Sequence, residues 1–458
     1  MRNAFRVGGI LFIILLAVFA PVIWSGYAEW KQAEIAAPYT EVAEHYLSAA
    51  KRLPWQPDLY EFAGTAYYHA KEYSLASAAY QKAFQRGALS AEGWVAWGDV
   101  NYLNGDHPRA AEIWEQGLSQ KNPSENLYSR LARIYEEDKD YSTAAEYLQK
   151  YLPDHLEDAS AHYQLGLLLT LSDPNEALSQ LLNASQLDPQ FDPAVQTLRT
   201  ALNLSSLKDS PSERLVVIGR GLGLVNEWEL AHAAFEKAVK DDENNAEAWA
   251  WLGEANQQTG QEGSEELNQA LSLNPNSSTV RGLRGLYFQR VGNNREALVE
   301  FQTAAQLEPD NPAWAISIGE SYSKLGDLIR ALEAYQYAVT LEPDNTNYYL
   351  LLAGFCAQNN VNMDVGISAA QKAVQLTPED PRALDMLGWL YTMSDRDSEA
   401  EAMLSTALER DPKLASAHYH LALLYLQKGD YVSMHNHLIQ ARDLGNNDAQ
   451  VLLNQYFP

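Results

Sequence analysis

Cysteine is almost absent from this chain of 458 residues, since Cys356 is the only one. A single thiol excludes an intrachain disulfide and a metal site built from several cysteines. Lysine and arginine are also scarce, with 33 basic against 60 acidic residues and a formal net charge of -27. Nucleic-acid binders carry clustered Lys and Arg that contact phosphates, and no such block occurs here. We therefore expect no nucleic-acid partner.

The motifs of several enzyme classes are missing as well. The chain has no phosphate-binding loop, no His-Glu-x-x-His pair and no nucleophile elbow. Residues 215–223 imitate the glycine turn of a dinucleotide site, but Leu224 occupies the place of the third glycine, so a helix is favoured. Near the carboxyl end, a metal site is the less favoured alternative for the four histidines at 418, 420, 435 and 437, because i, i+2 spacing directs each pair to different helix faces. We expect no catalytic, cofactor-binding or metal-binding residues.

Only one long uncharged stretch occurs, from Val7 to Ala28, after Arg2 and Arg6. As a helix it would reach about 33 Å, enough for a hydrocarbon core of about 30 Å. Residues 1–28 are therefore expected to be a transmembrane anchor, or else a signal peptide cut after Ala28. Arginines before the stretch and acidic residues after it favour a single-pass membrane protein with an extracytoplasmic remainder. The alternative is a secreted or periplasmic protein after cleavage.

The rest of the chain is repetitive. Small residues recur at intervals of about 34 residues, a period typical of repeat arrays in which each unit contacts its neighbours. They form two series, Gly64, Gly98, Ala132 and Gly166, then Gly219, Gly253, Gly285, Gly319, Ala353, Gly388 and Ala422.

Each repeat contains the patterns of two helices. Tyr60-Ala63-Gly64-Tyr67 falls at i, i+3, i+4 and i+7, which is one face of a first helix. A short polar turn and a second pattern such as Ala331-Tyr335-Ala338 follow, and many repeats close on a proline. Small side chains let two antiparallel helices approach closely, bulky ones fill the spaces between pairs, and proline ends a helix.

The pattern resembles the tetratricopeptide repeat family, a helix–turn–helix unit of 34 residues. Close matches are Trp94-Trp97-Gly98 with Ala110-Trp114, and Trp249-Leu252-Gly253 with Ala270. The resemblance implies an all-α fold, a right-handed superhelical α-solenoid of roughly eleven repeats, preceded by the one N-terminal transmembrane or signal helix.

The expected domain organisation follows from the repeats and from the one place where their spacing breaks. After residues 1–28 comes an N-terminal helical segment at 29–56, then a first array at 57–189. An atypical helix and linker occupy 190–211, a second array 212–445, and a C-terminal capping helix 446–458, because terminal repeats must cover their apolar face.

The resemblance also implies where a partner binds. In this family the inner, concave face is lined by first-helix residues, and exposed aromatics beside acids there suit a peptide laid into a groove. The candidate groove residues are Glu61, Tyr68, Val95, Asp99, Tyr102, Glu254, Glu320, Lys324, Trp389 and Tyr419.

We therefore expect a non-catalytic, membrane-tethered scaffold for protein–protein or protein–peptide interaction in the cell envelope. The net charge favours basic partners. The alternative function is a component of envelope polysaccharide or lipopolysaccharide assembly that binds carbohydrate or a transferase.

Overall fold

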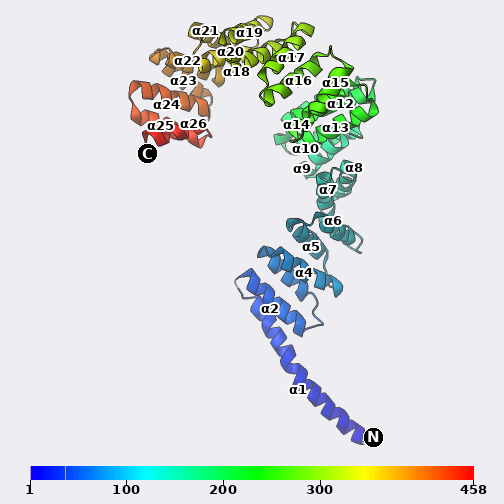
Figure 1. Ribbon diagram of the computed structural model, residues 1–458. Coiled ribbons are helices and arrows are strands. Elements are labelled where there is room, and N and C mark those ends of the chain that lie inside the picture. The colour runs from blue at the N-terminus through cyan, green and yellow to red at the C-terminus, as the bar shows by residue number, and fades with distance from the viewer. Residues whose placement is uncertain (1, 37, 458) are drawn as a thin grey trace. The chain divides into compact units, whose positions relative to one another are not determined.

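The computed structural model describes the backbone of residues 2–36 and 38–457, and the side chains of that range from residue 17 onward. Within these residues all regular structure is helical (Figure 1). The chain divides into two compact units, residues 1–207 with 224–226, and residues 208–223 with 227–458. Each unit is described by itself below.

The first unit consists of the 32-residue helix α1 and a succession of shorter helices, most of them in antiparallel pairs. It contains α1 (Arg2–Ala33), α2 (Tyr39–Arg52), α3 (Leu59–His69), α4 (Tyr73–Gln85), α5 (Ala91–Leu103), α6 (His107–Leu118), α7 (Asn126–Glu137), α8 (Tyr141–Tyr151), η1 (Leu152–Asp154), α9 (Ala159–Leu169), α10 (Pro174–Leu187), η2 (Pro189–Phe191) and α11 (Asp192–Ser206).

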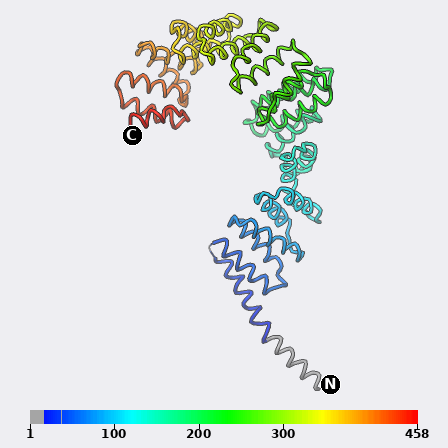
Figure 2. Tube along the Cα trace, in the orientation of Figure 1, coloured from blue at the N-terminus to red at the C-terminus, as the bar shows by residue number. Residues whose placement is uncertain are grey.

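The second unit continues the same pairing, and Figure 2 shows its Cα trace from green to red. It contains α12 (Pro211–Leu224), α13 (Trp228–Asp241), α14 (Ala246–Gln258), α15 (Ser264–Leu273), α16 (Ser278–Arg290), α17 (Asn294–Leu307), α18 (Pro312–Lys324), α19 (Leu328–Leu341), α20 (Thr346–Asn359), α21 (Met363–Leu376), α22 (Pro381–Met393), α23 (Asp397–Arg410), α24 (Ala415–Lys428), α25 (Tyr431–Asp443) and α26 (Asn447–Tyr456).

Contacts between paired helices explain the periodic small residues. In α5, a Cβ added to Gly98 would lie 2.0 Å from the indole nitrogen of Trp114 in α6, so only glycine allows this approach. The same contact recurs between Gly219 of α12 and the ring of Phe235 in α13. The first helix of a pair therefore supplies the gap and the second helix fills it. The expected all-α solenoid of repeats is confirmed.

Helix ends follow the polar turns of the sequence. The Asp106 side chain caps α6 by accepting a hydrogen bond from the backbone N–H of Arg109 at 3.2 Å. Gly105, just before it, has a φ of 83°, a left-handed conformation that suits glycine. Residues 215–223 lie within α12, so they form a helix and no dinucleotide turn.

The amino-terminal helix requires a correction. Among the residues that the structure describes, none of the helices combines the length and apolar composition needed to cross a membrane. This finding contradicts the expected single-pass membrane protein. The apolar centre of the expected anchor, residues 10–16, lies outside the described side chains.

The physical reason lies in the last turns of α1, which pack against the rest of the first unit. A Cβ on Gly26 would lie 2.7 Å from Cγ of Leu53, and Ala33 is buried. The Glu29 carboxylate accepts from the guanidinium of Arg52 at 3.0 Å and lies 2.7 Å from Nδ1 of His45. The helix therefore continues through the expected boundary at Ala28, and a cut there would fall inside it.

Candidate functional site

Four successive first helices of the first unit line one groove. The groove encloses about 380 Å³. Its walls come from α3, α5, α7 and α9, and its lining residues are Tyr68, Asp99, Tyr102, Leu103, Ser129, Arg130, Arg133 and Gln164. We call it the first-array groove. It brings together three of the ten residues expected from the sequence: Tyr68, Asp99 and Tyr102.

An ion pair neutralises the acid of this groove. Nε and Nη2 of Arg130 donate to the two carboxylate oxygens of Asp99 at 2.6 and 3.0 Å. This bidentate geometry joins α5 to α7 and holds both side chains in place. The Asp99 carboxylate therefore ties neighbouring repeats together.

Aromatic rings and a second arginine form the other part of the groove. The guanidinium of Arg133 lies 4.3 Å from the ring centroid of Tyr102, a cation–π contact. The ring of His107 also stacks on Tyr102, with ring centroids 4.5 Å apart. The Tyr102 hydroxyl donates to Glu137, and this hydrogen bond, more than burial, raises the pKa of Tyr102. Tyr102 is therefore a neutral, oriented ring.

Glu61 and Val95 have contacts within the array. The carboxylate of Glu61 accepts from the backbone N–H and the hydroxyl of Ser90, at 2.7 and 2.5 Å, at the start of α5. Val95 is buried in a core cluster with Trp114 and Leu127. Both side chains are thus engaged in the packing of one repeat on the next.

Two acids expected from the second array also contact a neighbouring helix. Glu254 of α14 is 4 % exposed, and its carboxylate accepts two hydrogen bonds from the Arg290 guanidinium of α16. Glu320 of α18 accepts from the side-chain amide of Gln289 in α16 at 3.3 Å. As with Asp99, these carboxylates connect the first helices of successive repeats.

The remaining three expected residues lie at separate points of the second unit. Lys324 is exposed at the end of α18. Trp389 stacks on His420 with ring centroids 4.7 Å apart, and Tyr419 packs against the core cluster formed by α24, α25 and α26. Burial raises the pKa of Tyr419, and the charge of Asp448 adds to the effect.

The histidines near the carboxyl end are engaged with other side chains. Nδ1 of His420 lies 2.7 Å from Oδ1 of Asp385, and Nδ1 of His418 lies 3.0 Å from Nδ1 of His437. His435 packs edge-on against Phe457. Within the described residues no group of three His, Cys, Asp or Glu side chains is arranged to hold a metal ion.

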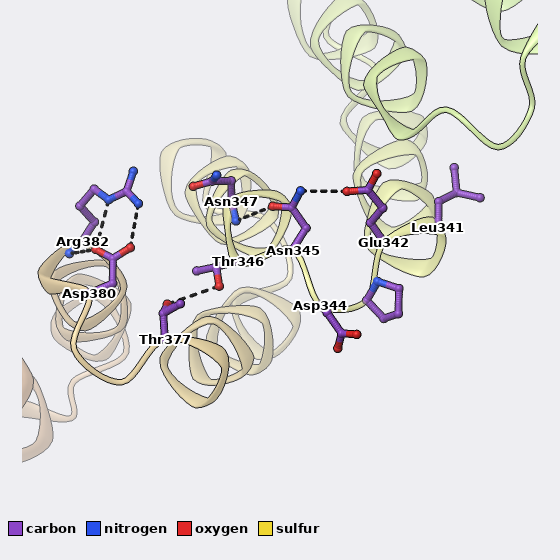
Figure 3. Close-up of a pocket in the computed structure, with 10 residues that line it drawn as sticks. Leu341, Glu342, Asp344, Asn345, Thr346, Asn347, Thr377, Asp380 and Arg382 are labelled. Carbon is purple, nitrogen blue, oxygen red and sulfur yellow. Dashed lines mark hydrogen bonds and ion pairs between the residues drawn. The ribbon is translucent and has the colours of Figure 1, made fainter. Parts of the chain in front are cut away.

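A larger hollow lies in the second unit but is built from helix caps (Figure 3). It encloses about 630 Å³ between the turns at Pro343 and Thr377. The Asn345 side chain caps α20 by accepting a hydrogen bond from the backbone N–H of Asn347 at 3.0 Å. The Asp380 side chain caps α22 in the same way, by accepting from the N–H of Arg382 at 2.9 Å. Since these side chains are bound to their own helix ends, the first-array groove is the stronger candidate site.

Comparison with known proteins decides the family. The model of a family described as "Tetratricopeptide repeat" matches residues 60–126, 219–278, 283–345, 316–381 and 394–433, more than half of the chain. The chain belongs to the tetratricopeptide repeat family.

Individual relatives are distant. Human Superkiller complex protein 3 is 25% identical over 220 residues, which cover 45% of this chain and 12% of that protein. The yeast Tom70 crystal structure has 16% identity over 96% of this chain and 95% of that chain, with a TM-score of 0.41. A tetratricopeptide repeat protein from Parabacteroides merdae has 17% identity over 53% of this chain and 98% of that chain, with a TM-score of 0.42.

Five groove residues were not anticipated from the sequence: Leu103, Ser129, Arg130, Arg133 and Gln164. A signal for two of them was present, because the tetratricopeptide period of 34 residues relates equivalent positions. Ser129 stands one repeat after Val95, and Arg133 one repeat after Asp99. A shift of 34 residues from the expected groove positions Val95 and Asp99 therefore identifies Ser129 and Arg133.

Proposed function

We propose that this tetratricopeptide protein is a non-catalytic scaffold that binds an extended peptide segment of a partner protein in the first-array groove. The observation that carries the proposal is the lining of one groove by four successive first helices. A ligand that crosses several repeats gains contacts from each of them, as an extended peptide does. A scaffold role in protein–protein interaction is consistent with the family.

The chemistry of the groove suits a peptide. Tyr68 and Tyr102 offer aromatic surface for apolar side chains, which supply most affinity at protein interfaces. Ser129 and Gln164 offer a hydroxyl and an amide to the peptide backbone. The guanidinium of Arg133 donates hydrogen bonds to carbonyl or carboxylate oxygens while it stacks on Tyr102.

The net charge of the chain is negative, whereas the Arg133 side chain in the groove is positive. The net charge of -27 favours partners that carry basic residues, by steering them during approach. We therefore propose a basic partner protein whose bound segment places apolar side chains on the tyrosines. Because steering is screened by salt, the association rate with such a partner should fall steeply as ionic strength rises.

A random peptide library displayed on phage, selected against the full chain, tests this proposal. The selected peptides should lose at least tenfold in affinity to the variants Arg133→Ala and Tyr68→Ala, measured by fluorescence anisotropy. Lys324→Ala, an exposed substitution in the second array, serves as the matched control and should change nothing. Peptides that bind both groove variants as tightly as the native chain would refute the groove as the binding site.

A further inference from the structure

A third cavity lies within the second unit. It encloses about 340 Å³ between α17, α18 and α19. We call it the alanine pocket, since three of its residues are alanines. Its lining consists of Ala305, Pro309, Asn311, Ala315, Ile318, Tyr322, Arg330, Glu333, Ala334 and Tyr337.

The preceding repeat shows what normally fills this space. One repeat before Ala315 stands Arg281, and one repeat before Ala334 stands Glu300. Arg281 and Arg284 both pair with the buried carboxylate of Glu300, at 2.9 and 3.1 Å. Bulky, mutually bonded side chains therefore close the equivalent space there.

The following repeat closes the space in a different way. Val339 stands one repeat after Ala305, and Tyr349 stands one repeat after Ala315. Both side chains pack against the hydrophobic core of the second unit. The repeat that contains the pocket has only alanine methyl groups at these positions. The pocket therefore arises because side-chain volume is missing there.

The alanine pocket is separate from the face on which the groove residues were expected. Within α18, Ile318 and Tyr322 line the pocket, whereas Glu320 lies two residues from each. Two residues correspond to about 200° around a helix, so the two sets lie on opposite sides of α18. A ligand in the pocket would therefore leave the Glu320 side of this helix uncovered.

Two exposed apolar side chains lie on α19, which forms one wall of the pocket. Tyr337 is 51% exposed and Ile329, beside the lining residue Arg330, is 73% exposed. Large apolar side chains that stay in water beside a preformed cavity are typical of protein interaction surfaces. A cavity of this volume suits one or two side chains of a partner.

The lining of the pocket carries one acidic side chain, Glu333, and one basic side chain, Arg330. The carboxylate of Glu333 is exposed, and no cation among the described residues pairs with it. Asp310, next to the lining residue Pro309, is also exposed. The one cation of the lining, Arg330, pairs with Asp327 at 3.4 Å and lies over the ring of Tyr322. A ligand that places a positive charge beside its apolar group therefore complements Glu333 and Asp310.

We infer that the alanine pocket docks a helix of a partner protein, which inserts an aromatic or long aliphatic side chain and places a Lys or Arg against Glu333. This interaction is independent of the first-array groove, and it adds a second point of attachment. Two attachment points on one solenoid increase the overall affinity for a partner that reaches both.

The probe is a dye-labelled amphipathic helical peptide with one central tryptophan flanked by lysines, and binding to the full chain is measured by fluorescence anisotropy. The variant Ala315→Tyr copies the residue of the next repeat and fills the pocket, and Ala305→Val does so to a smaller extent. We expect at least a tenfold loss of affinity with Ala315→Tyr and a threefold to tenfold loss with Ala305→Val or Glu333→Gln. Controls are Glu320→Gln and Arg133→Ala, which should leave the affinity unchanged.

The outcomes separate this inference from the proposed groove. Equal affinity of the native chain and of both filled variants would overturn the alanine pocket. Equal affinity for a peptide with glutamates in place of the lysines would overturn the basic partner. Loss of binding in Arg133→Ala alone would assign the probe to the first-array groove and would also overturn the pocket. Circular dichroism of each variant checks that it folds. If Ala315→Tyr fails to fold, the smaller substitution Ala305→Val still tests the pocket.

Discussion

Replacement of Gly98 by alanine should destabilise the first unit although alanine is the better helix former. The added Cβ would lie 2.0 Å from Nε1 and 2.3 Å from Cδ1 of Trp114, whose side chain is fully buried. The indole must then move, and it must weaken its hydrogen bond to the carbonyl of Val95, which is 3.2 Å long.

The magnitude follows from three contributions. Overpacking of a core costs about 1–3 kcal/mol, and the lost hydrogen bond costs about 0.5–1.5 kcal/mol. Replacement of glycine by alanine inside a helix stabilises that helix by about 1 kcal/mol. The net expectation for Gly98→Ala is a loss of about 0.5–3.5 kcal/mol.

Gly319→Ala is the matched control, since Gly319 holds the same place in its repeat. There the added Cβ would lie 3.0 Å from the ring of Tyr335, which requires only a small shift. The gain in helix propensity of about 1 kcal/mol should offset most of that cost, so this variant should stay within about 1 kcal/mol of the native chain.

Amide hydrogen exchange is the suitable assay, because long repeat arrays do not unfold in a single cooperative transition. The amides of α5 and α6 should exchange faster in Gly98→Ala, while those of α18 and α19 should change little in Gly319→Ala. Exchange in α5 and α6 that is as slow as in the native chain would refute the close contact with Trp114.

Two further predictions concern a buried carboxylate and a partly buried histidine. Glu254→Ala should cost about 1–3 kcal/mol and increase exchange in α14, because Arg290 loses its bidentate partner; unchanged exchange there would show that the pair is dispensable. Burial and the charge of His418 lower the pKa of His437 from 6.5. As the pH falls, His437 therefore becomes protonated in the unfolded chain before it does in the folded chain. The free energy of unfolding should thus decrease as the pH drops below about 6.5. His437→Gln should reduce the decline of the thermal midpoint between about pH 8 and pH 5, and identical profiles would contradict this assignment.

Much of the fold could be read from local sequence. The helix pairs were predicted from the repeat period, the amphipathic faces and the turn residues. This was possible because each repeat contacts only its neighbours, so most contacts join residues that are close in sequence. The contact of Gly98 with Trp114 is an example, since both residues stand at fixed places within one repeat. The amino-terminal helix is present, but its assignment as a membrane span was wrong. Hydropathy alone did not reveal the packing of Gly26 and Glu29 against residues 52 and 53.

The candidate sites depended more on contacts between side chains of neighbouring helices, which the sequence alone does not reveal. Asp99, Glu254 and Glu320 were expected as groove acids, and the structure connects each to a side chain of a neighbouring first helix. Those partners stand about one repeat away, and the side-chain orientation that brings them together varies from repeat to repeat. The alanine pocket was not anticipated, because a single alanine carries no signal until its neighbours in space are known.

The sequence by itself determined that this protein is a stack of helical hairpins, since the period and the small-to-large pairing within each repeat are local properties of the chain. Tertiary structure alone decided which charges are neutralised, which aromatic rings stay accessible, and where side-chain volume is missing. These features depend on contacts between repeats, where distance and direction in space matter and spacing along the chain is not sufficient.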